Sequence, residues 1–137
     1  MCGRLNLQAT QLTQLLLSIL QQTYPGEDDY NTAPTQTLPV IRSGADGRLE
    51  CLPMRWWLTP SWSQGPSTQY SMFNAKVETA AKSPAFKIPF AKQRCVIPVT
   101  GFYEWHRRAG RKQPFLICDQ AQEGLLLAGL WDAWCPR

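Results

Sequence analysis

The chain begins with a cysteine whose position would make it a nucleophile once the initiator methionine is removed. Cys2 would then carry an α-amine and a thiol on adjacent carbons. A free α-amine has a pKa of roughly 7.7–8.0, so a useful fraction of it is neutral and nucleophilic near neutral pH. The amine can attack an aldehyde to give a Schiff base, and the thiol can then close a thiazolidine ring. With a base nearby, the thiol can also attack acyl carbons.

Two other side chains have the chemistry to assist such a nucleophile. In the segment GFYEWHR, strand alternation places Glu104 on the same face as Phe102 and His106. A carboxylate among aromatic rings is partly desolvated and suits proton transfer, although pairing with the neighbouring arginines explains it equally well. Asn74 offers an amide that can orient a hydroxyl or carbonyl group, and a turn or capping role is the alternative.

The composition is that of one globular domain over residues 1–137. Hydrophobic residues make up 44% and charged residues 18% of the 137 residues, enough to bury a core. The six tryptophans exceed what such a core needs, so we expect some to stack on a partner. The net charge of +4 is compatible with an anionic partner. The densest basic stretch of the sequence is HRRAGRK (106–112). Contact with an anionic partner and a solvated hairpin tip explain this stretch equally well.

The cysteines and the single histidine exclude several classes of site. The five cysteines are odd in number and lack C-x-x-C spacing, and the lone histidine has no second one to join it. We therefore expect no disulfide framework, no metal and no cofactor. The sequence shows neither a signal-peptide pattern nor an apolar run of about 20 residues. These features predict a cytoplasmic protein without membrane contact.

The hydrophobic pattern predicts an α+β fold with a mainly antiparallel, barrel-like sheet and one N-terminal helix packed on it. The helix is expected to begin at an N-cap on Thr10, to bury a leucine-rich stripe and to end at 24–26. The remaining expected elements are a hairpin from 37–42 and 48–54, a short helix within 73–86, a second hairpin from 95–107 and 113–119, and a buried strand that begins the segment 124–134.

The last expected strand is followed almost at once by the end of the sequence, WCPR. An open sheet that ends so abruptly has an unpaired edge. We therefore expect the fold to be truncated at its C-terminus.

Five ordered segments carry a resemblance that covers residues 1 to about 134. They are MCGR at the start, YNTAP at 30–34, PMRWWLTPSW at 53–62, FNAKVETA at 73–80 and GFYEWHR at 101–107. This series resembles the SRAP family (SOS response-associated peptidases), whose members shield abasic sites in single-stranded DNA. The first segment is tied to the N-terminus, which makes the series specific.

The resemblance implies a DNA-damage response protein that works without a cofactor as a monomer and is nucleoid-associated when bound. Its partner would be single-stranded DNA with abasic sites, crosslinked through a thiazolidine on Cys2, and peptidase and lyase activities are further family expectations. Asn74 would position the sugar and Glu104 would act as general acid–base. The implied DNA-binding residues are Arg4 and Lys76 on phosphates, with Asn31, Pro34 and Trp62 lining the groove, where Trp62 stacks on a base.

The chain departs from the family pattern at several positions. Lys76 stands where arginine is usual, which keeps the charge but loses bidentate phosphate geometry. In the family a glycine commonly follows the first tryptophan of this segment, and here Trp57 stands in its place. Ser63 stands where some members have a second aromatic residue. The chain also ends before the family histidine associated with strand incision and crosslink reversal, so we expect one domain without the C-terminal part of the family fold.

Two other functions fit the sequence. An N-terminal-nucleophile amidohydrolase would use the thiol of Cys2 on an amide and the α-amine as base. A non-catalytic single-stranded DNA-binding remnant would use only the tryptophans and the basic turn, and would never form a covalent adduct.

Overall fold

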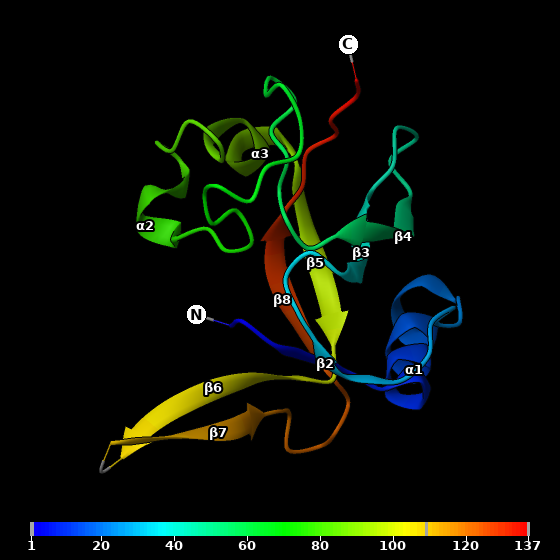
Figure 1. The fold of residues 1–137 in the computed structure, drawn as a ribbon. Coiled ribbons are helices and arrows are strands. Elements are labelled where there is room, and N and C mark those ends of the chain that lie inside the picture. The colour runs from blue at the N-terminus through cyan, green and yellow to red at the C-terminus, as the bar shows by residue number, and fades with distance from the viewer. Residues whose placement is uncertain (1, 109, 137) are drawn as a thin grey trace.

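The computed structural model describes residues 2–108 and 110–136 and contains short helices among a larger number of strands (Figure 1). In chain order the elements are β1 (Leu5–Leu7), α1 (Ala9–Leu20), β2 (Asp29–Thr32), β3 (Thr37–Ser43), β4 (Leu49–Arg55), α2 (Val77–Ala80), α3 (Lys87–Lys92), β5 (Arg94–Val99), β6 (Gly101–Arg108), β7 (Arg111–Ile117) and β8 (Leu125–Leu130).

The strands form two four-stranded sheets, in the orders β2-β1-β6-β7 and β4-β3-β5-β8. Every strand pair in both sheets is antiparallel. The predicted α+β class with antiparallel pairing is therefore confirmed, and the strands are divided between two open sheets, neither of which closes into a barrel.

The hydrophobic core lies where the two sheets and α1 meet. Leu5 and Leu7 of β1, Leu12 of α1 and Val99 of β5 are at most 2% exposed and pack in one cluster. Burying a side chain of this size contributes roughly 1.5–3 kcal/mol. β1 therefore contributes to the core with two of its three residues, although it is the shortest strand.

Helix α1 carries the predicted apolar stripe but begins earlier than predicted. It starts at Ala9 after the N-cap residue Gln8, which makes no side-chain cap hydrogen bond. Instead the backbone N–H of Ala9 donates to Oδ1 of Asp28 at 2.7 Å. The Thr10 cap was wrong because a carboxylate distant in sequence takes over the capping role. The helix also ends earlier, at Leu20, and the φ of 57° at its C-cap residue Gln21 lies in the left-handed region.

Both predicted hairpins are present, but the segment 95–107 is two strands instead of one. β3 pairs with β4, and β6 pairs with β7. Between β5 and β6 the chain bends at Thr100, whose backbone N–H and hydroxyl both donate to the carbonyl oxygen of Asn6, at 2.9 and 2.8 Å. A Cβ on the next residue, Gly101, would lie 2.7 Å from the carbonyl oxygen of Ile117. The bend moves the chain from one sheet to the other.

The other predicted elements agree in position with the structure. The short helix within 73–86 corresponds to α2, and the strand that begins the segment 124–134 corresponds to β8. β8 is only half-buried because it pairs with β5 alone at the edge of its sheet. No helix among the described residues is long and apolar enough to cross a membrane.

We expect Leu12→Ala to lower the free energy of unfolding by about 2–5 kcal/mol, because it leaves a cavity in the core. Leu17→Ala on the same helix is the matched control, since Leu17 is 46% exposed; its effect should stay within about 0.5 kcal/mol. Urea unfolding followed by circular dichroism measures both. Similar losses in the two variants would show that α1 does not face the core in solution as described.

Candidate functional site

Cys2 lies just before β1, which is held on both sides by other strands. β1 pairs with β2 and with β6, and the backbone N–H of Tyr103 donates to the carbonyl oxygen of Arg4 at 3.0 Å. Cys2 is half-buried and packs against the core cluster. The position of the predicted nucleophile is therefore fixed by a buried strand, although chain ends are usually mobile.

Asn74 contacts the N-terminal segment directly. Its Nδ2 donates to the carbonyl oxygen of Cys2 at 2.7 Å, across 72 positions of sequence. Sequence spacing could not reveal this contact, because the chain between the two residues passes through both hairpin strands β3 and β4. The structure thus brings together two of the three predicted catalytic residues.

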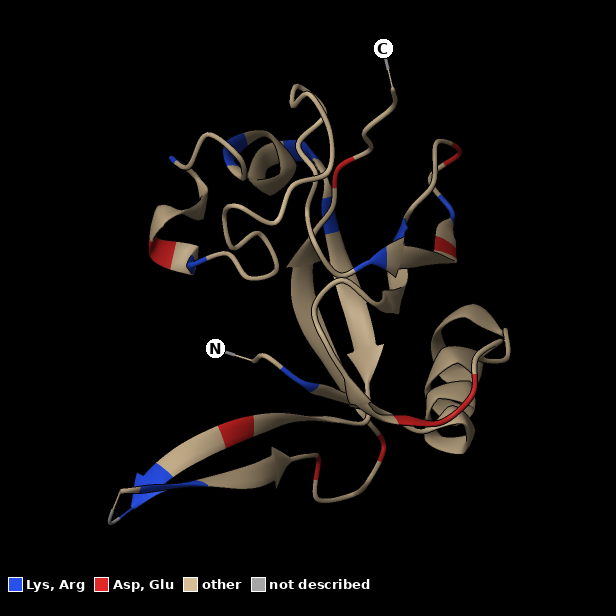
Figure 2. Ribbon diagram, in the orientation of Figure 1, with Lys and Arg blue, Asp and Glu red and all other residues tan. Residues whose placement is uncertain are grey.

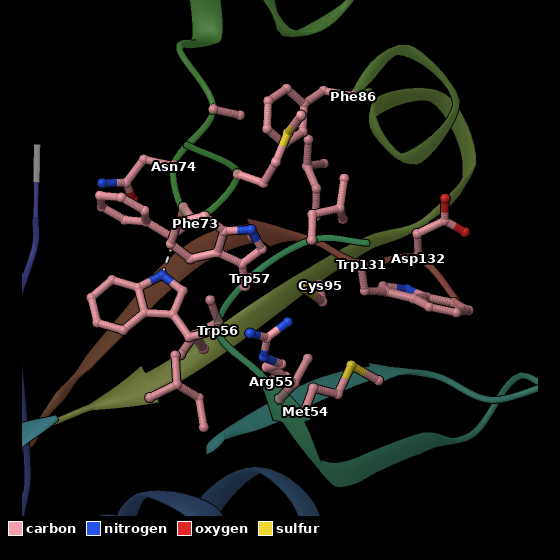
Figure 3. A pocket seen from close by; sticks show the side chains of 18 of the residues that line it. Met54, Arg55, Trp56, Trp57, Phe73, Asn74, Phe86, Cys95, Trp131 and Asp132 are labelled. Atoms are coloured by element: carbon pink, nitrogen blue, oxygen red, sulfur yellow. Dashed lines mark hydrogen bonds between the residues drawn. The ribbon is translucent and has the colours of Figure 1, made fainter. Parts of the chain in front are cut away.

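The loop that carries Asn74 is held by two tryptophans (Figure 3). The indole Nε1 of Trp56 donates to the carbonyl oxygen of Phe73 at 2.9 Å, and the two rings meet edge to face with centroids 6.0 Å apart. The ring of Trp57 lies 5.5 Å from that of Phe73. Because Trp56 is buried, its hydrogen bond fixes the backbone one residue before Asn74.

Glu104 lies on β6 and acts on Cys2 electrostatically. Burial is the larger cause that raises the pKa of the Cys2 thiol, and the negative charge of Glu104 raises it further. Glu104, the third predicted catalytic residue, therefore lies close enough to Cys2 for its charge to act on the thiol. A raised pKa means that the thiol remains mostly protonated near neutral pH.

Arg4 and Asn31 form a pair beside this site. Nη1 of Arg4 donates to Oδ1 of Asn31 at 3.0 Å. The neighbouring Tyr103 hydroxyl donates to the carbonyl oxygen of Tyr30 at 2.9 Å and so ties β6 to β2. The prediction missed this role of Tyr103, since the alternation of the strand indicated only which face it occupies.

Pro34 lies in a turn, and Lys76 lies at the end of the loop that precedes α2. Lys76 is exposed, two residues after Asn74 and directly before α2. Pro34 is half-buried in the turn between β2 and β3, next to Thr35, whose backbone N–H donates to the carbonyl oxygen of Trp56 at 3.0 Å.

Trp62 is separate from this group. It is 55% exposed and, with Trp134, lines a small cavity that does not include Cys2. The Nε1 of Trp134 donates to the carbonyl oxygen of Ser63 at 3.0 Å and orders this part of the loop. The structure therefore does not place Trp62, a predicted site residue, beside Cys2.

A larger cavity, of about 990 Å³, was not predicted from the sequence. Cys2 and Asn74 line it together with many apolar side chains, among them Trp57, Phe86 and Trp131 (Figure 3). The density of tryptophans in the sequence was the available signal, but it did not indicate a concave surface. Within residues 2–108 and 110–136, no group of three or more His, Cys, Asp or Glu side chains is placed to hold a metal ion.

We expect Glu104→Gln to make Cys2 more reactive toward iodoacetamide at pH 8, by roughly two- to tenfold. Loss of the carboxylate charge lowers the thiol pKa, and a pKa change of one unit changes the thiolate fraction about tenfold. Peptide mass spectrometry of the alkylated protein measures the rate at each cysteine. Exposed Cys118 is the internal reference, and Glu123→Gln is the matched loss of a different carboxylate. An unchanged or slower rate at Cys2 would contradict the electrostatic coupling.

Comparison with known proteins gives one consistent family. The model of the SOS response associated peptidase (SRAP) family matches residues 1–137. The abasic site processing protein YoaM of Bacillus subtilis is 37% identical over 98% of this chain and 60% of its own length. The abasic site processing protein HMCES of Gallus gallus is 34% identical over 78% of this chain and 40% of its own length.

Solved structures agree with the fold. A crystal structure of a Bordetella bronchiseptica protein superposes with a TM-score of 0.81 at 24% identity, over 97% of this chain and 64% of the other. A Bacteroides thetaiotaomicron protein gives a TM-score of 0.82 at 22% identity, over 98% and 62%. The chain spans about 60% of the length of the Bacillus relatives. Because the family model matches residues 1–137, the chain belongs to the SOS response associated peptidase (SRAP) family.

Proposed function

We propose that this chain takes part in the DNA-damage response by forming a covalent link between Cys2 and abasic sites in single-stranded DNA. The observation that carries the proposal is the hydrogen bond from Asn74 to Cys2, within a chain whose relatives are named abasic site processing proteins. An abasic site in its ring-opened form presents an aldehyde, which is the electrophile that an N-terminal cysteine traps best.

The proposed reaction begins after hydrolytic removal of Met1. The α-amine of Cys2 attacks the aldehyde carbon to give a carbinolamine, which loses water to become an imine. The thiol then adds to the imine carbon, and its proton passes to the nitrogen as the thiazolidine ring closes. No oxidant or reductant is needed, because the only product lost is one molecule of water.

Asn74 and Glu104 have separate roles in this proposal. Asn74, held by the loop at Phe73, orients the N-terminal residue and the sugar. Glu104 carries the protons that the carbinolamine, the imine and the thiol must exchange, and general acid–base catalysis of this kind contributes typically 10²–10⁴-fold. Its effect on the Cys2 pKa supports its placement near the thiol.

The DNA-binding residues would surround these groups. Arg4 and Lys76 would contact phosphates on either side of the lesion, with Asn31 and Pro34 lining the groove. Trp62, away from Cys2, would stack on a base farther along the strand. Peptidase activity on the Met1 peptide would use the thiol of Cys2 as the nucleophile on the Met1 carbonyl carbon.

A denaturing gel with single-stranded DNA that contains one abasic site tests the crosslink. We expect a heat-stable shifted band for the wild type and none for Cys2→Ala. Cys2→Ser keeps the α-amine and should give an adduct only when borohydride traps the imine. Glu104→Gln and Asn74→Ala should slow the reaction by roughly 10²-fold or more.

Two controls accompany the gel. Cys118→Ala removes an exposed thiol elsewhere and should crosslink normally, and the same DNA without the lesion should give no band. If no lesion-dependent band forms although intact mass shows that Met1 is absent, the crosslinking proposal is wrong for this chain.

The role of Trp62 can be tested apart from the chemistry, in a Cys2→Ala background that cannot crosslink. Trp62→Ala should weaken binding of single-stranded DNA by about 1–3 kcal/mol, because one stacked base is lost. Tyr70→Ala is the matched control, since Tyr70 is an exposed aromatic residue of the same long loop. Fluorescence anisotropy measures both affinities, and equal values for the two variants would remove Trp62 from the binding surface.

A further inference from the structure

The hairpin of β6 and β7 extends from the body of the molecule and has a strongly basic tip (Figures 1 and 2). Four cationic side chains lie on its last two cross-strand pairs, and all four are exposed: Arg107, Arg108, Arg111 and Lys112. Glu104 is the only acidic residue among the residues of the two strands, and it lies nearer the base of the hairpin.

The strand register places the like charges of the hairpin tip opposite one another. Arg107 lies directly opposite Lys112, and Arg108 directly opposite Arg111. Like charges in directly opposed cross-strand positions are destabilising. The salt bridges observed among the described residues are elsewhere, on β3–β4 and the turn between them. The four cations therefore fit a partner that is itself anionic.

The register divides the hairpin into two faces. Because strand side chains alternate, Glu104, His106 and Arg108 share one face, and the residues opposite them, including Arg111, share it too. We call this the Glu104 face. The rings of His106 and Phe115 meet on it with centroids 6.5 Å apart.

The opposite side of the hairpin, the Trp105 face, carries Trp105, Arg107 and Lys112. Glu104 is the residue that acts electrostatically on Cys2, and Phe102 on the same face packs against the core cluster, as Cys2 does. The Glu104 face therefore leads toward Cys2, whereas the Trp105 face leads toward β2 through the Tyr103 hydroxyl, which donates to the carbonyl oxygen of Tyr30.

The spacing of residues along the Glu104 face gives the distance from Glu104 to the cations at the tip of the hairpin. From Glu104 to Arg108 is four residues, or about 13 Å at roughly 3.3 Å per residue. The roughly 3.4 Å rise per nucleotide of a stacked helix makes about four nucleotides the upper limit of this distance, because an extended single strand covers more length per nucleotide. Arginine is suited to phosphate because its planar guanidinium can form two parallel hydrogen bonds.

We propose that the β6–β7 hairpin is a phosphate-binding arm, with Arg108 and Arg111 on the Glu104 face holding the DNA backbone within about four nucleotides of Glu104. The arm extends the DNA contact beyond the residues that surround the reactive cysteine. This inference rests on the proposed function for its ligand, DNA, and on the hairpin alone for its geometry.

The test is the salt dependence of equilibrium binding to unmodified single-stranded DNA, which involves no crosslinking. Arg108→Gln/Arg111→Gln should reduce the slope of log K against log salt by about 1.4, because each phosphate contact on a single strand contributes about 0.7. The matched control Arg107→Gln/Lys112→Gln removes the same charge from the same two cross-strand pairs, but on the other face. Its slope should stay close to that of the wild type.

A series of shorter oligonucleotides with an abasic site locates the contact. When at most one nucleotide flanks the lesion on either side, the wild type and Arg108→Gln/Arg111→Gln should crosslink at equal rates. With longer flanks the double variant should need more protein for half-maximal rate and reach the same maximal rate, since the arm touches no reacting atom. Thermal unfolding of both double variants checks that the hairpin still folds.

The outcomes separate the arm from the crosslinking proposal. Equal slopes for the wild type and both double variants, or a larger loss in the Trp105-face control, would overturn the arm even if crosslinking occurs normally. A reduced slope confined to Arg108→Gln/Arg111→Gln would support the arm even if no crosslink ever forms, and the failure would then lie with the proposed chemistry.

Discussion

The candidate site depends on the burial of β1. This strand has only three residues, yet it pairs on both sides and its residues are at most 2% exposed. Since Cys2 lies three residues before Leu5, there is too little chain between them for the thiol to move far. An N-terminal nucleophile needs a free chain end, and a free chain end is normally mobile. The buried strand directly after Cys2 meets both requirements of the proposed reaction.

The electrostatics of Cys2 give the proposed reaction an order. Burial and Glu104 both raise the pKa of the thiol, so the thiol is a weak nucleophile near neutral pH. An α-amine ionises at roughly 7.7–8.0 and is the better nucleophile there. The amine would therefore act first on an aldehyde, and the thiol would react only with the imine held next to it. This order would spare the thiol from indiscriminate reaction with other electrophiles.

Local sequence signals predicted local structure well. The two hairpins and the apolar stripe of α1 follow from turn residues and periodicity, which act over a few positions. The Thr10 cap and the continuous strand over 95–107 were wrong because distant groups decided them. Asp28 caps α1 from the far end of a loop, and Asn6 of β1 binds the chain at Thr100, where it passes between the sheets.

The sequence by itself determined the chemistry available to this protein: a cysteine at position 2, an acid on a strand, an amide in a loop and a family pattern that joins them. Only the tertiary structure decided that Asn74 reaches Cys2, that Glu104 influences its thiol, and that Trp62 lies apart. The physical reason is that side-chain types are fixed residue by residue, whereas contacts across 72 positions depend on how two sheets and a tryptophan-held loop pack together. Those packing forces act on surfaces that exist only after the chain has folded.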